Sequence, residues 1–304
     1  MTTSSHNVFS DATRGMLYGL IGVIAFSITL PATRLAVSVL DPVFVGMGRA
    51  VVAAVLAGIY LFVGKHRLPD KQEFKVLVVV SMALVVGWPL LTAYAMRYVA
   101  ASHGGVLLGI LPLATAVAGF VFTHERPSAV FWLLAVLGST LVVVFSLLQG
   151  GGVMHLADAA LFVAVICAAS GYALGAKLAR TLGGLQVISW ALVIAAPFVV
   201  VPAILYAPPT LNFAPDIWLS FIYVSVISQF LGFLPWYKGL TLGGVARVGQ
   251  IQLLQPFFTL AASALLLGEV VTGVTLVFAG AVCAVVAAGR HLDKLKMAKK
   301  FSAR

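Results

Sequence analysis

The chain has 304 residues, of which 62% are hydrophobic and 9% are charged, with a mean hydropathy of +1.09. So little charge cannot cover the surface of a soluble domain of this length, which excludes that class. The formal net charge of +10 could suit nucleic acid, but the basic residues lie at the ends of apolar segments and in the stretch RHLDKLKMAKKFSAR. No soluble basic face is visible, so we expect no nucleic-acid partner.

The apolar segments are about 20 residues long, enough to cross a hydrocarbon core about 30 Å thick. Turn-forming stretches separate them, among them LDPV at 40–43, THERPS at 123–128 and YAPPTLNFAPD at 206–216. We therefore predict an all-α integral membrane protein with ten transmembrane helices. The expected spans are 15–39, 42–64, 74–98, 101–123, 128–149, 156–179, 185–206, 215–239, 243–267 and 271–290.

The distribution of charge orients these spans. With the N-terminus inside, all but three of the 19 Lys and Arg residues fall on the cytoplasmic side, as the positive-inside rule requires. We predict a bacterial cytoplasmic (inner) membrane protein with both termini in the cytoplasm. The first apolar segment, from Gly15, is too long for a cleavable signal peptide. Cys167 and Cys283 lie in apolar runs, so we expect neither a disulfide framework nor a metal site.

An internal repeat relates HGGVLLGILPLATAVAGFVFTHE (103–125) to RVGQIQLLQPFFTLAASALLLGE (247–269). An offset of 144 residues superposes Gly105 on Gly249, Pro112 on Pro256 and Glu125 on Glu269. With five helices in each copy, the second copy is inserted upside down, which is a transporter architecture. The predicted parts are a cytoplasmic segment at 1–14, repeats at 15–149 and 150–290, and a basic cytoplasmic tail at 291–304.

This helix–Pro–helix–Glu pattern in both halves, together with Arg49 early in the second span, resembles the EamA-type members of the drug/metabolite transporter superfamily. The resemblance covers about residues 15–290. It implies two inverted five-helix halves around a central cavity, and a carrier that moves small metabolites, usually outward.

Three glutamines interrupt the apolar stretch GGVARVGQIQLLQPFF at 243–258. Gln252 and Gln255 lie only about 60° apart on a helix and share a face at mid-depth, while Gln250 points to the opposite side. Pro256 cannot donate to the carbonyl of Gln252, which predicts a broken helix of the kind that lines a cavity. The alternative for all three amides is a structural role, in which they form hydrogen bonds between neighbouring helices.

Other prolines mark the same depth: Pro31, Pro89, Pro112 and Pro235. Nearby polar and aromatic side chains are candidate cavity residues, since aromatic rings clasp flat ligands and amides orient them. These candidates are Trp88, Tyr94, Gln229, Tyr172, Trp236 and Tyr237. Packing of the sixth span is an alternative for Tyr172, and an interfacial aromatic belt is an equal alternative for Trp236 and Tyr237.

Arg34, Arg49 and Arg97 depart from the charge rule. Arg34 and Arg97 lie near outer ends and could snorkel to the surface. Arg49 lies deeper, where we favour an ion pair with Asp41 over a contact with a substrate carboxylate.

All nine acidic residues fall at helix ends, in loops or in the termini, and His103 and His155 read as wetted loop residues near outer ends. The sequence therefore shows no evident proton switch, and facilitated movement down a gradient is the simplest mechanism. Glu125 and Glu269 read as helix caps.

These observations predict an exporter of small polar or amphiphilic metabolites, such as amino acids or related zwitterions, that works by alternating access. Efflux of drugs or hydrophobic cations is the alternative, and an integral-membrane enzyme is a distant one. We expect no catalytic residues, no metal and no cofactor. The lipid bilayer and a small-molecule substrate are the expected partners, and the sequence is compatible with a monomer.

Overall fold

The computed structural model describes residues 5–123, 129–149, 155–243, 248–285 and 288. Within them, every regular element is a helix, and η marks a 3-10 or π-helical segment. The first part of the chain contains α1 Ser5–Ser27, α2 Thr29–Val37, η1 Phe44–Gly48, α3 Arg49–Val63, α4 Lys71–Val80, η2 Ser81–Gly87, α5 Trp88–Tyr98, α6 Ala101–Leu107, η3 Leu108–Ile110, α7 Leu111–Thr123 and α8 Ala129–Gln149. The second part contains α9 Leu156–Leu182, α10 Gly184–Leu205, α11 Pro215–Ile222, η4 Tyr223–Leu231, α12 Phe233–Gly243, η5 Gly249–Leu254, α14 Gln255–Leu267 and an apolar helix at Gly273–Val285.

Seven helical segments in the described residues are long and apolar enough to cross a membrane. They are Thr13–Val37, Phe44–Val63, Lys71–Tyr98, Ala101–Phe122, Leu156–Leu182, Gly184–Leu205 and Pro215–Gly243. Three shorter apolar helices lie at Val136–Phe145, Ile251–Leu267 and Gly273–Val285. The prediction of an all-helical, multi-pass membrane protein agrees with these segments. The expected cytoplasmic segment at 1–14 is helical from Ser5 as an extension of α1, and the tail at 291–304 lies outside the described residues.

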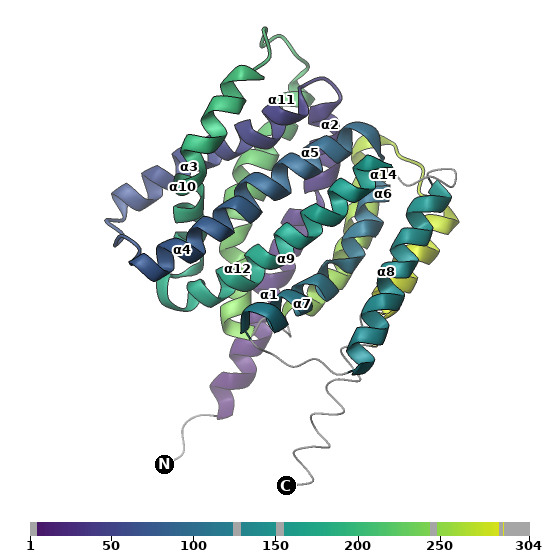
Figure 1. Ribbon diagram of the computed structural model, residues 1–304, viewed down its shortest axis with the longest axis horizontal. Helices are drawn as coiled ribbons and strands as arrows, with labels where there is room; N and C mark the ends of the chain where they lie inside the picture. The colour runs from purple at the N-terminus through teal and green to yellow at the C-terminus, as the bar shows by residue number, and fades with distance from the viewer. Residues whose placement is uncertain (1–4, 124–128, 150–154, 244–247, 286–287, 289–304) are drawn as a thin grey trace.

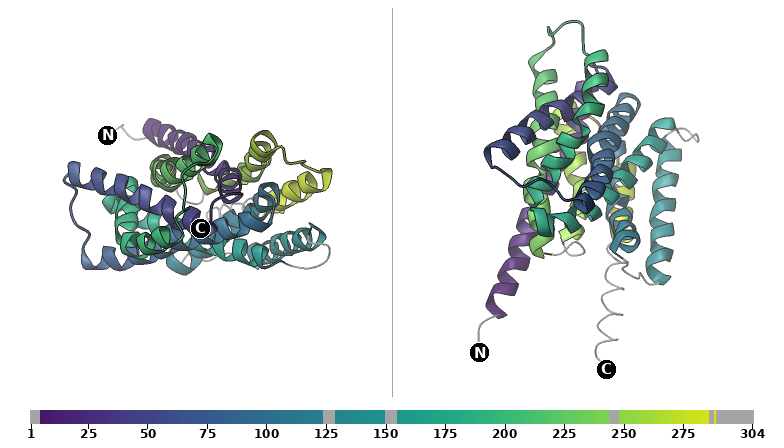
Figure 2. Two further views of the ribbon diagram at one scale, coloured as in Figure 1. Left: turned by 90° about the horizontal axis from the view of Figure 1, so that it is seen from above. Right: turned by 60° about the vertical axis from the view of Figure 1, so that its left-hand side comes forward.

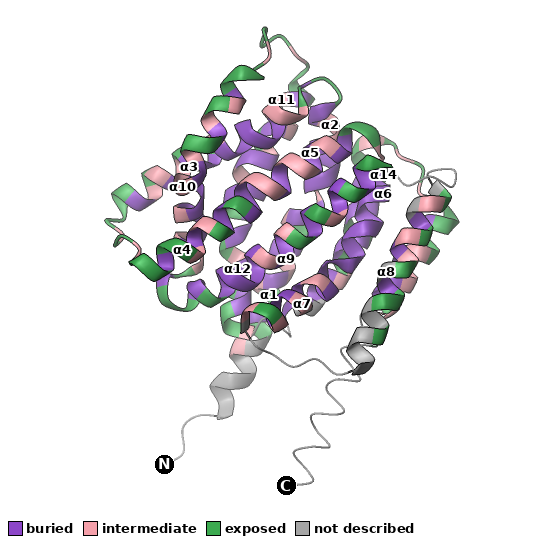
Figure 3. Ribbon diagram, in the orientation of Figure 1, coloured by how far each residue is buried: buried purple, intermediate pink, exposed green. Residues whose placement is uncertain are grey.

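The helices form an elongated bundle in which α8 and the helix Gly273–Val285 lie side by side at one end (Figures 1 and 2). Phe145 of α8 and Phe278 join these two helices, with 5.4 Å between ring centroids. At the opposite end, α3 and α10 pack together. Figure 3 shows buried residues concentrated on α6, α9 and α12 in the middle of the bundle, while the free ends of α3 and α10 carry exposed residues.

The prolines predicted at mid-depth all lie where one helical segment gives way to the next. Pro31 follows the junction of α1 and α2, and Pro89 is the second residue of α5 after the π-helical η2. Pro235 lies in the first turn of α12, after the π-helical η4. Because proline donates no backbone N–H, it suits the first turn of a segment, where that N–H would have no intrahelical partner.

The two aligned stretches share the same local structure. The 3-10 segment η3 ends at Ile110 and α7 runs over Leu111–Thr123, while η5 ends at Leu254 and α14 runs over Gln255–Leu267. Each of these boundaries is displaced by the 144 residues that the sequence alignment requires. Pro112 and Pro256 are therefore both the second residue of an α-helix that follows a 3-10 turn.

Glycines let the helices of the bundle approach at backbone distance. A Cβ atom on Gly239 of α12 would lie 2.8 Å from the Gly15 carbonyl oxygen and 2.8 Å from the Gly19 nitrogen of α1. A Cβ atom on Gly105 of α6 would lie 2.9 Å from Cγ2 of Thr259 in α14. The helix breaks of the two aligned stretches consequently pack against each other near the centre of the bundle.

Candidate functional site

Arg49 begins α3 in the interior of the bundle, where its residue is 1% exposed. Its Nη2 donates to Oγ of Ser228 in η4 at 2.9 Å. The Nε and Nη1 groups are buried and have no hydrogen-bond partner among the described residues. The predicted ion pair with Asp41 is wrong, because Asp41 is exposed and accepts the backbone N–H of Val43 at 2.7 Å instead. A guanidinium with two orphaned donors is costly to bury and favourable to a ligand that accepts hydrogen bonds.

A band of hydroxyl groups continues from Arg49 across the bundle. Ser228 also hydrogen-bonds with Thr29 of α2, with 2.8 Å between their oxygens. Two residues earlier, the carbonyl oxygen of Ser27 accepts the Thr259 hydroxyl of α14 at 3.0 Å. Pro31 is four residues after Ser27 and has no N–H to offer it, so Thr259 satisfies the carbonyl that the proline frees. Both polar contacts lie beside helix breaks and connect segments distant in sequence.

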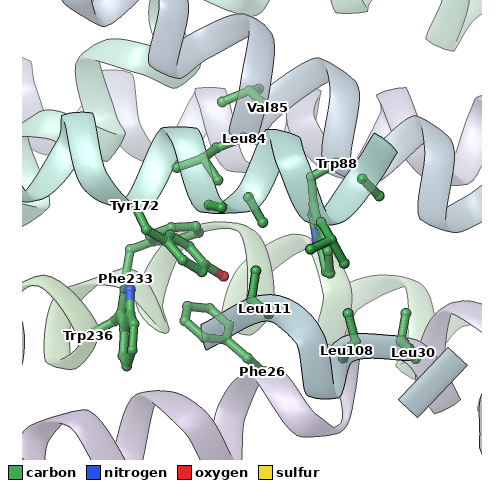
Figure 4. Close-up of a cluster of buried hydrophobic side chains, with 14 of the residues drawn as sticks. Phe26, Leu30, Leu84, Val85, Trp88, Leu108, Leu111, Tyr172, Phe233 and Trp236 are labelled. Carbon is green, nitrogen blue, oxygen red and sulfur yellow. The ribbon is translucent and has the colours of Figure 1, made fainter. Parts of the chain in front are cut away.

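An aromatic group lies next to this band. The rings of Phe26 and Tyr172 contact each other, and each also contacts the rings of Phe233 and Trp236. The ring centroids are 5.5 Å apart for Tyr172 and Trp236 and 5.1 Å apart for Phe26 and Phe233. In Figure 4 the Tyr172 hydroxyl points away from Phe233 and Trp236. Phe26 directly precedes Ser27 in α1, which places this group next to the polar band.

The residues Trp236 and Tyr237 are fully buried in α12. The alternative of an interfacial belt is therefore wrong for both. The Trp236 indole nitrogen is buried without a partner among the described residues, while the Tyr237 hydroxyl donates to the carbonyl of Gly171 at 3.3 Å. Gly175 leaves the space that this phenol occupies, since a Cβ atom there would lie 2.0 Å from the Tyr237 oxygen. Tyr237 thus fixes α12 to α9, whereas the Trp236 donor has no partner in the part of the chain that the structure describes.

The three glutamines that are described in the core differ in their partners. Gln252 and Gln255 are 1% and 3% exposed, and Oε1 of Gln252 has no partner among the described residues. Gln229 donates through Nε2 to the Leu84 carbonyl at 3.1 Å and thereby joins η4 to η2. The backbone carbonyl of Gln252 is not left open as predicted, because the 3-10 turn lets it accept the N–H of Gln255. Nothing is described of the Gln250 side chain.

Other predicted site residues lie apart from Arg49 or serve different contacts. Trp88 is 9% exposed and joins the buried cluster of Figure 4. Tyr94 is half-buried and packs on the exposed Tyr98, with 5.0 Å between ring centroids. Arg34 and Arg97 do not simply extend to the membrane surface. The Arg34 guanidinium donates to the Met96 carbonyl near the end of α5, and the Arg97 guanidinium donates to the Val37 carbonyl at the end of α2. Cationic groups at helix C-termini complement the helix dipole.

Sequence reasoning missed a buried pair at the start of α6 and α9. His103 Nε2 lies 2.6 Å from Asp158 Oδ1, and the two side chains are 10% and 0% exposed. The expectation that His103 is a wetted loop residue is therefore wrong. Two features of the sequence could have indicated this pair. His103 lies two residues after the start of an apolar helix, and Asp158 lies in the first turn of another.

Glu269 does cap a helix start, as expected, but the helix is α6 rather than the one that follows it in sequence. Its two carboxylate oxygens accept the backbone N–H groups of Ala101 and Ser102, each at 2.8 Å. The matching residue Glu125 lies outside the described residues.

An apolar groove of about 610 Å³ lies between α4, η2 and α10, away from Arg49. Phe74, Met82 and Phe198 are among its walls and are themselves partly exposed on the side of the bundle. Such a wall suits lipid tails and offers no charged partner to a polar substrate. Within the described part of the chain, no group of three His, Cys, Asp or Glu side chains is arranged to hold a metal ion.

Comparison with known proteins identifies the class. The EamA-like transporter family matches residues 13–147 and again residues 155–288. A relative from Bacillus subtilis (strain 168), named uncharacterized transporter YdeK, is 46% identical over 293 residues, which cover 94% of this chain and 100% of the relative. A protein of known crystal structure has 13% sequence identity and a TM-score of 0.62, covering 92% of this chain and 98% of that one, and so shares the fold. The family and the relative point to a transporter rather than an enzyme.

Proposed function

Because the chain belongs to the EamA-like transporter family, we propose that it exports small metabolites that carry a carboxylate, namely amino acids or related zwitterions. Export through the bacterial cytoplasmic membrane by alternating access is the proposed mechanism. The seven long and three shorter apolar helices would together form ten spans, in two inverted halves with both termini in the cytoplasm. The two family matches and the shared 3-10 turns before Pro112 and Pro256 support the two halves.

Arg49 is the observation that carries the choice of substrate. A substrate carboxylate would accept a hydrogen bond from Nε or from Nη1, neither of which has a partner among the described residues, together with a second one from the remaining N–H of Nη2. A carboxylate matches the planar fork of a guanidinium, and this pairing is stronger than a hydrogen bond between neutral groups. The ligand would thereby supply the counter-charge that Ser228, a neutral hydroxyl, does not.

Two further orphaned groups suit the rest of a zwitterion. The Trp236 indole donates to an acceptor, and Oε1 of Gln252 accepts from a donor such as a substrate ammonium group. The rings of Phe26, Tyr172 and Trp236 would cover an apolar side chain. We infer that the substrate contacts both halves, since Arg49 precedes the midpoint of the chain and Trp236 and Gln252 follow it.

The helix breaks support alternating access. Segments that are broken near their middle can change angle at low cost, and the contacts at these breaks join the two halves, as Thr259 and Ser27 do. When the halves rock, the polar band around Arg49 would open to one side of the membrane and then to the other.

A flux assay tests this proposal. The purified protein is reconstituted in proteoliposomes and offered a panel of labelled amino acids and one lipophilic cation. We expect saturable amino-acid flux, a clearly raised KM in Arg49→Gln, and an unchanged KM in the control Arg97→Gln, whose guanidinium donates to a carbonyl at the end of a helix. Saturable flux of the cation without amino-acid flux would overturn the proposed substrate class, and equal KM values for Arg49→Gln and the parent protein would overturn the role of Arg49.

A further inference from the structure

The pair formed by His103 and Asp158 is the titratable group that the proposed transport site leaves unexplained. Nε2 of His103 lies 2.6 Å from Oδ1 of Asp158, and the other carboxylate oxygen accepts the backbone N–H of His155 at 3.1 Å. The imidazole ring packs on Phe145 of α8, with 5.1 Å between ring centroids. Both side chains are thus enclosed, and their contacts come from three different helices.

The pair joins the two halves of the chain. His103 belongs to α6 in the first half, and Asp158 belongs to α9 in the second half. Glu269, also from the second half, holds the Ala101 and Ser102 N–H groups at the start of the same helix. Two carboxylates of one half therefore fasten one helix end of the other half. In the proposed topology this end faces the outside, so a rocking of the two halves that opens the carrier outward would separate both contacts.

The remaining charges around α6 do not neutralise Asp158. His155, just before α9, contacts Asp158 through its backbone N–H, and Glu269, which follows α14, is an anion that accepts the N–H groups of Ala101 and Ser102. Arg34 of α2 and Arg97 of α5 are directed to the Met96 and Val37 carbonyls. Among their described residues, α8, η3 and α14 contribute no further titratable side chain. With His103 neutral, closing the contact buries a carboxylate without a counter-charge; with His103 protonated, it buries an ion pair at lower cost.

We propose that His103 and Asp158 form a proton-binding site that controls the outer gate of the carrier. One proton from the outer solution binds between His103 Nε2 and Asp158 Oδ1 when the gate closes, and it returns to that solution when the gate opens. Histidine is suited to this task because its charge ordinarily changes between about pH 5 and pH 8. Low outer pH therefore favours the closed gate and high outer pH the open one. This inference rests on the proposed transport function and topology.

Thiol labelling from outside measures the gate directly and needs no substrate. In a Cys167→Ala, Cys283→Ala background, Ser102→Cys places a thiol where the side chain is buried in the closed gate. Thr210→Cys, in the exposed loop after α10, corrects for the pH dependence of the reagent, a membrane-impermeant maleimide. The ratio of the two labelling rates should rise with outer pH between 5.5 and 8, by up to roughly tenfold per unit in the titrating range.

Variants separate proton binding from a merely structural contact. His103→Gln keeps a donor for Asp158 but carries no imidazole, so the rise of the ratio between pH 5.5 and 8 should be lost. Asp158→Asn removes the counter-charge of a protonated His103, so low pH should no longer favour the closed gate and the ratio should not rise with pH. The control Glu269→Gln weakens the neighbouring contact and should keep the pH dependence, with faster labelling throughout.

The inference is overturned if the ratio of labelling rates in the parent protein does not change with outer pH. It is also overturned if that ratio rises with pH as steeply in His103→Gln as in the parent protein. Because the parent protein alone can give the first of these results, the test does not depend on the folding of any substitution in the pair. A pH-dependent ratio in a protein that moves no amino acid would leave the gate in place and overturn only the proposed substrate.

Discussion

The guanidinium of Arg49 lies 2.9 Å from the hydroxyl of Ser228, and this neutral group is its hydrogen-bond partner in the described structure. Ser228 is itself bonded to Thr29, so one hydroxyl links three segments, α2, α3 and η4. A hydroxyl satisfies one donor but balances no charge, which leaves Arg49 expensive to bury. Residues kept at such a cost in stability generally serve function.

Arg49→Met should therefore stabilise the protein while it removes transport. The substitution retains an unbranched side chain of similar length and eliminates the two orphaned donors. We expect an increase of about 1 to 3 kcal/mol in the free energy of unfolding. Thermal unfolding of the purified protein in detergent measures it, beside amino-acid flux in proteoliposomes. A lower melting temperature would show that Arg49 is a structural residue.

Two glutamine substitutions should have opposite signatures. Gln252→Leu removes an amide whose oxygen has no partner among the described residues, so it should spare stability and impair flux. Gln229→Leu removes the hydrogen bond to the Leu84 carbonyl and should cost about 1 kcal/mol of stability. Melting temperature and flux, read together, distinguish the two. Normal flux in Gln252→Leu would assign that amide to helix packing.

The contact between the helix breaks should contribute measurably to stability. Thr259→Val keeps the shape of the side chain but leaves the Ser27 carbonyl without the donor it uses at 3.0 Å. The expected loss is about 1 to 3 kcal/mol, because an unsatisfied buried acceptor is costly. Thr259→Ser restores the hydroxyl and should recover most of this loss. Equal melting temperatures for the valine and serine variants would refute the assignment.

Gly175 should tolerate no side chain. A Cβ atom there would lie 2.0 Å from the Tyr237 oxygen, so Gly175→Ala should displace that ring and lower the melting temperature by several degrees. Gly58→Ala is the matched control, since its Cβ would meet no atom within 4 Å. A control that is as damaging as Gly175→Ala would indicate a general effect of alanine at helical glycines.

The sequence predicted the elements that depend on local rules. Apolar length identified the membrane segments, and missing N–H groups placed Pro112 and Pro256 at matching helix breaks. Local rules did not predict which donors satisfy the carbonyl groups that the prolines leave without an N–H. The Gln252 carbonyl is satisfied within its own 3-10 turn, whereas the Ser27 carbonyl depends on Thr259, more than 200 residues away.

The polar partners were predicted less well for the same reason. The sequence marks Arg49 as an unusual charge, but Asp41, expected near the outer end of the first helix, is not its partner. His103 and Asp158 were each placed at the end of a helix, where water is the usual partner, and their pairing depends on how α6 packs on α9. Long-range helix packing decides which polar side chains meet, and one sequence does not contain that information in readable form.

The most direct test of the central claim compares an amino acid with its amide, which lacks the carboxylate. Counterflow in proteoliposomes gives a KM for each compound in the parent protein and in Arg49→Gln. If Arg49 binds the carboxylate, the parent protein should prefer the acid by roughly 30-fold, equivalent to about 2 kcal/mol for a charge-assisted hydrogen bond, and Arg49→Gln should lose most of that preference. Equal KM values for the two compounds in the parent protein would contradict the account.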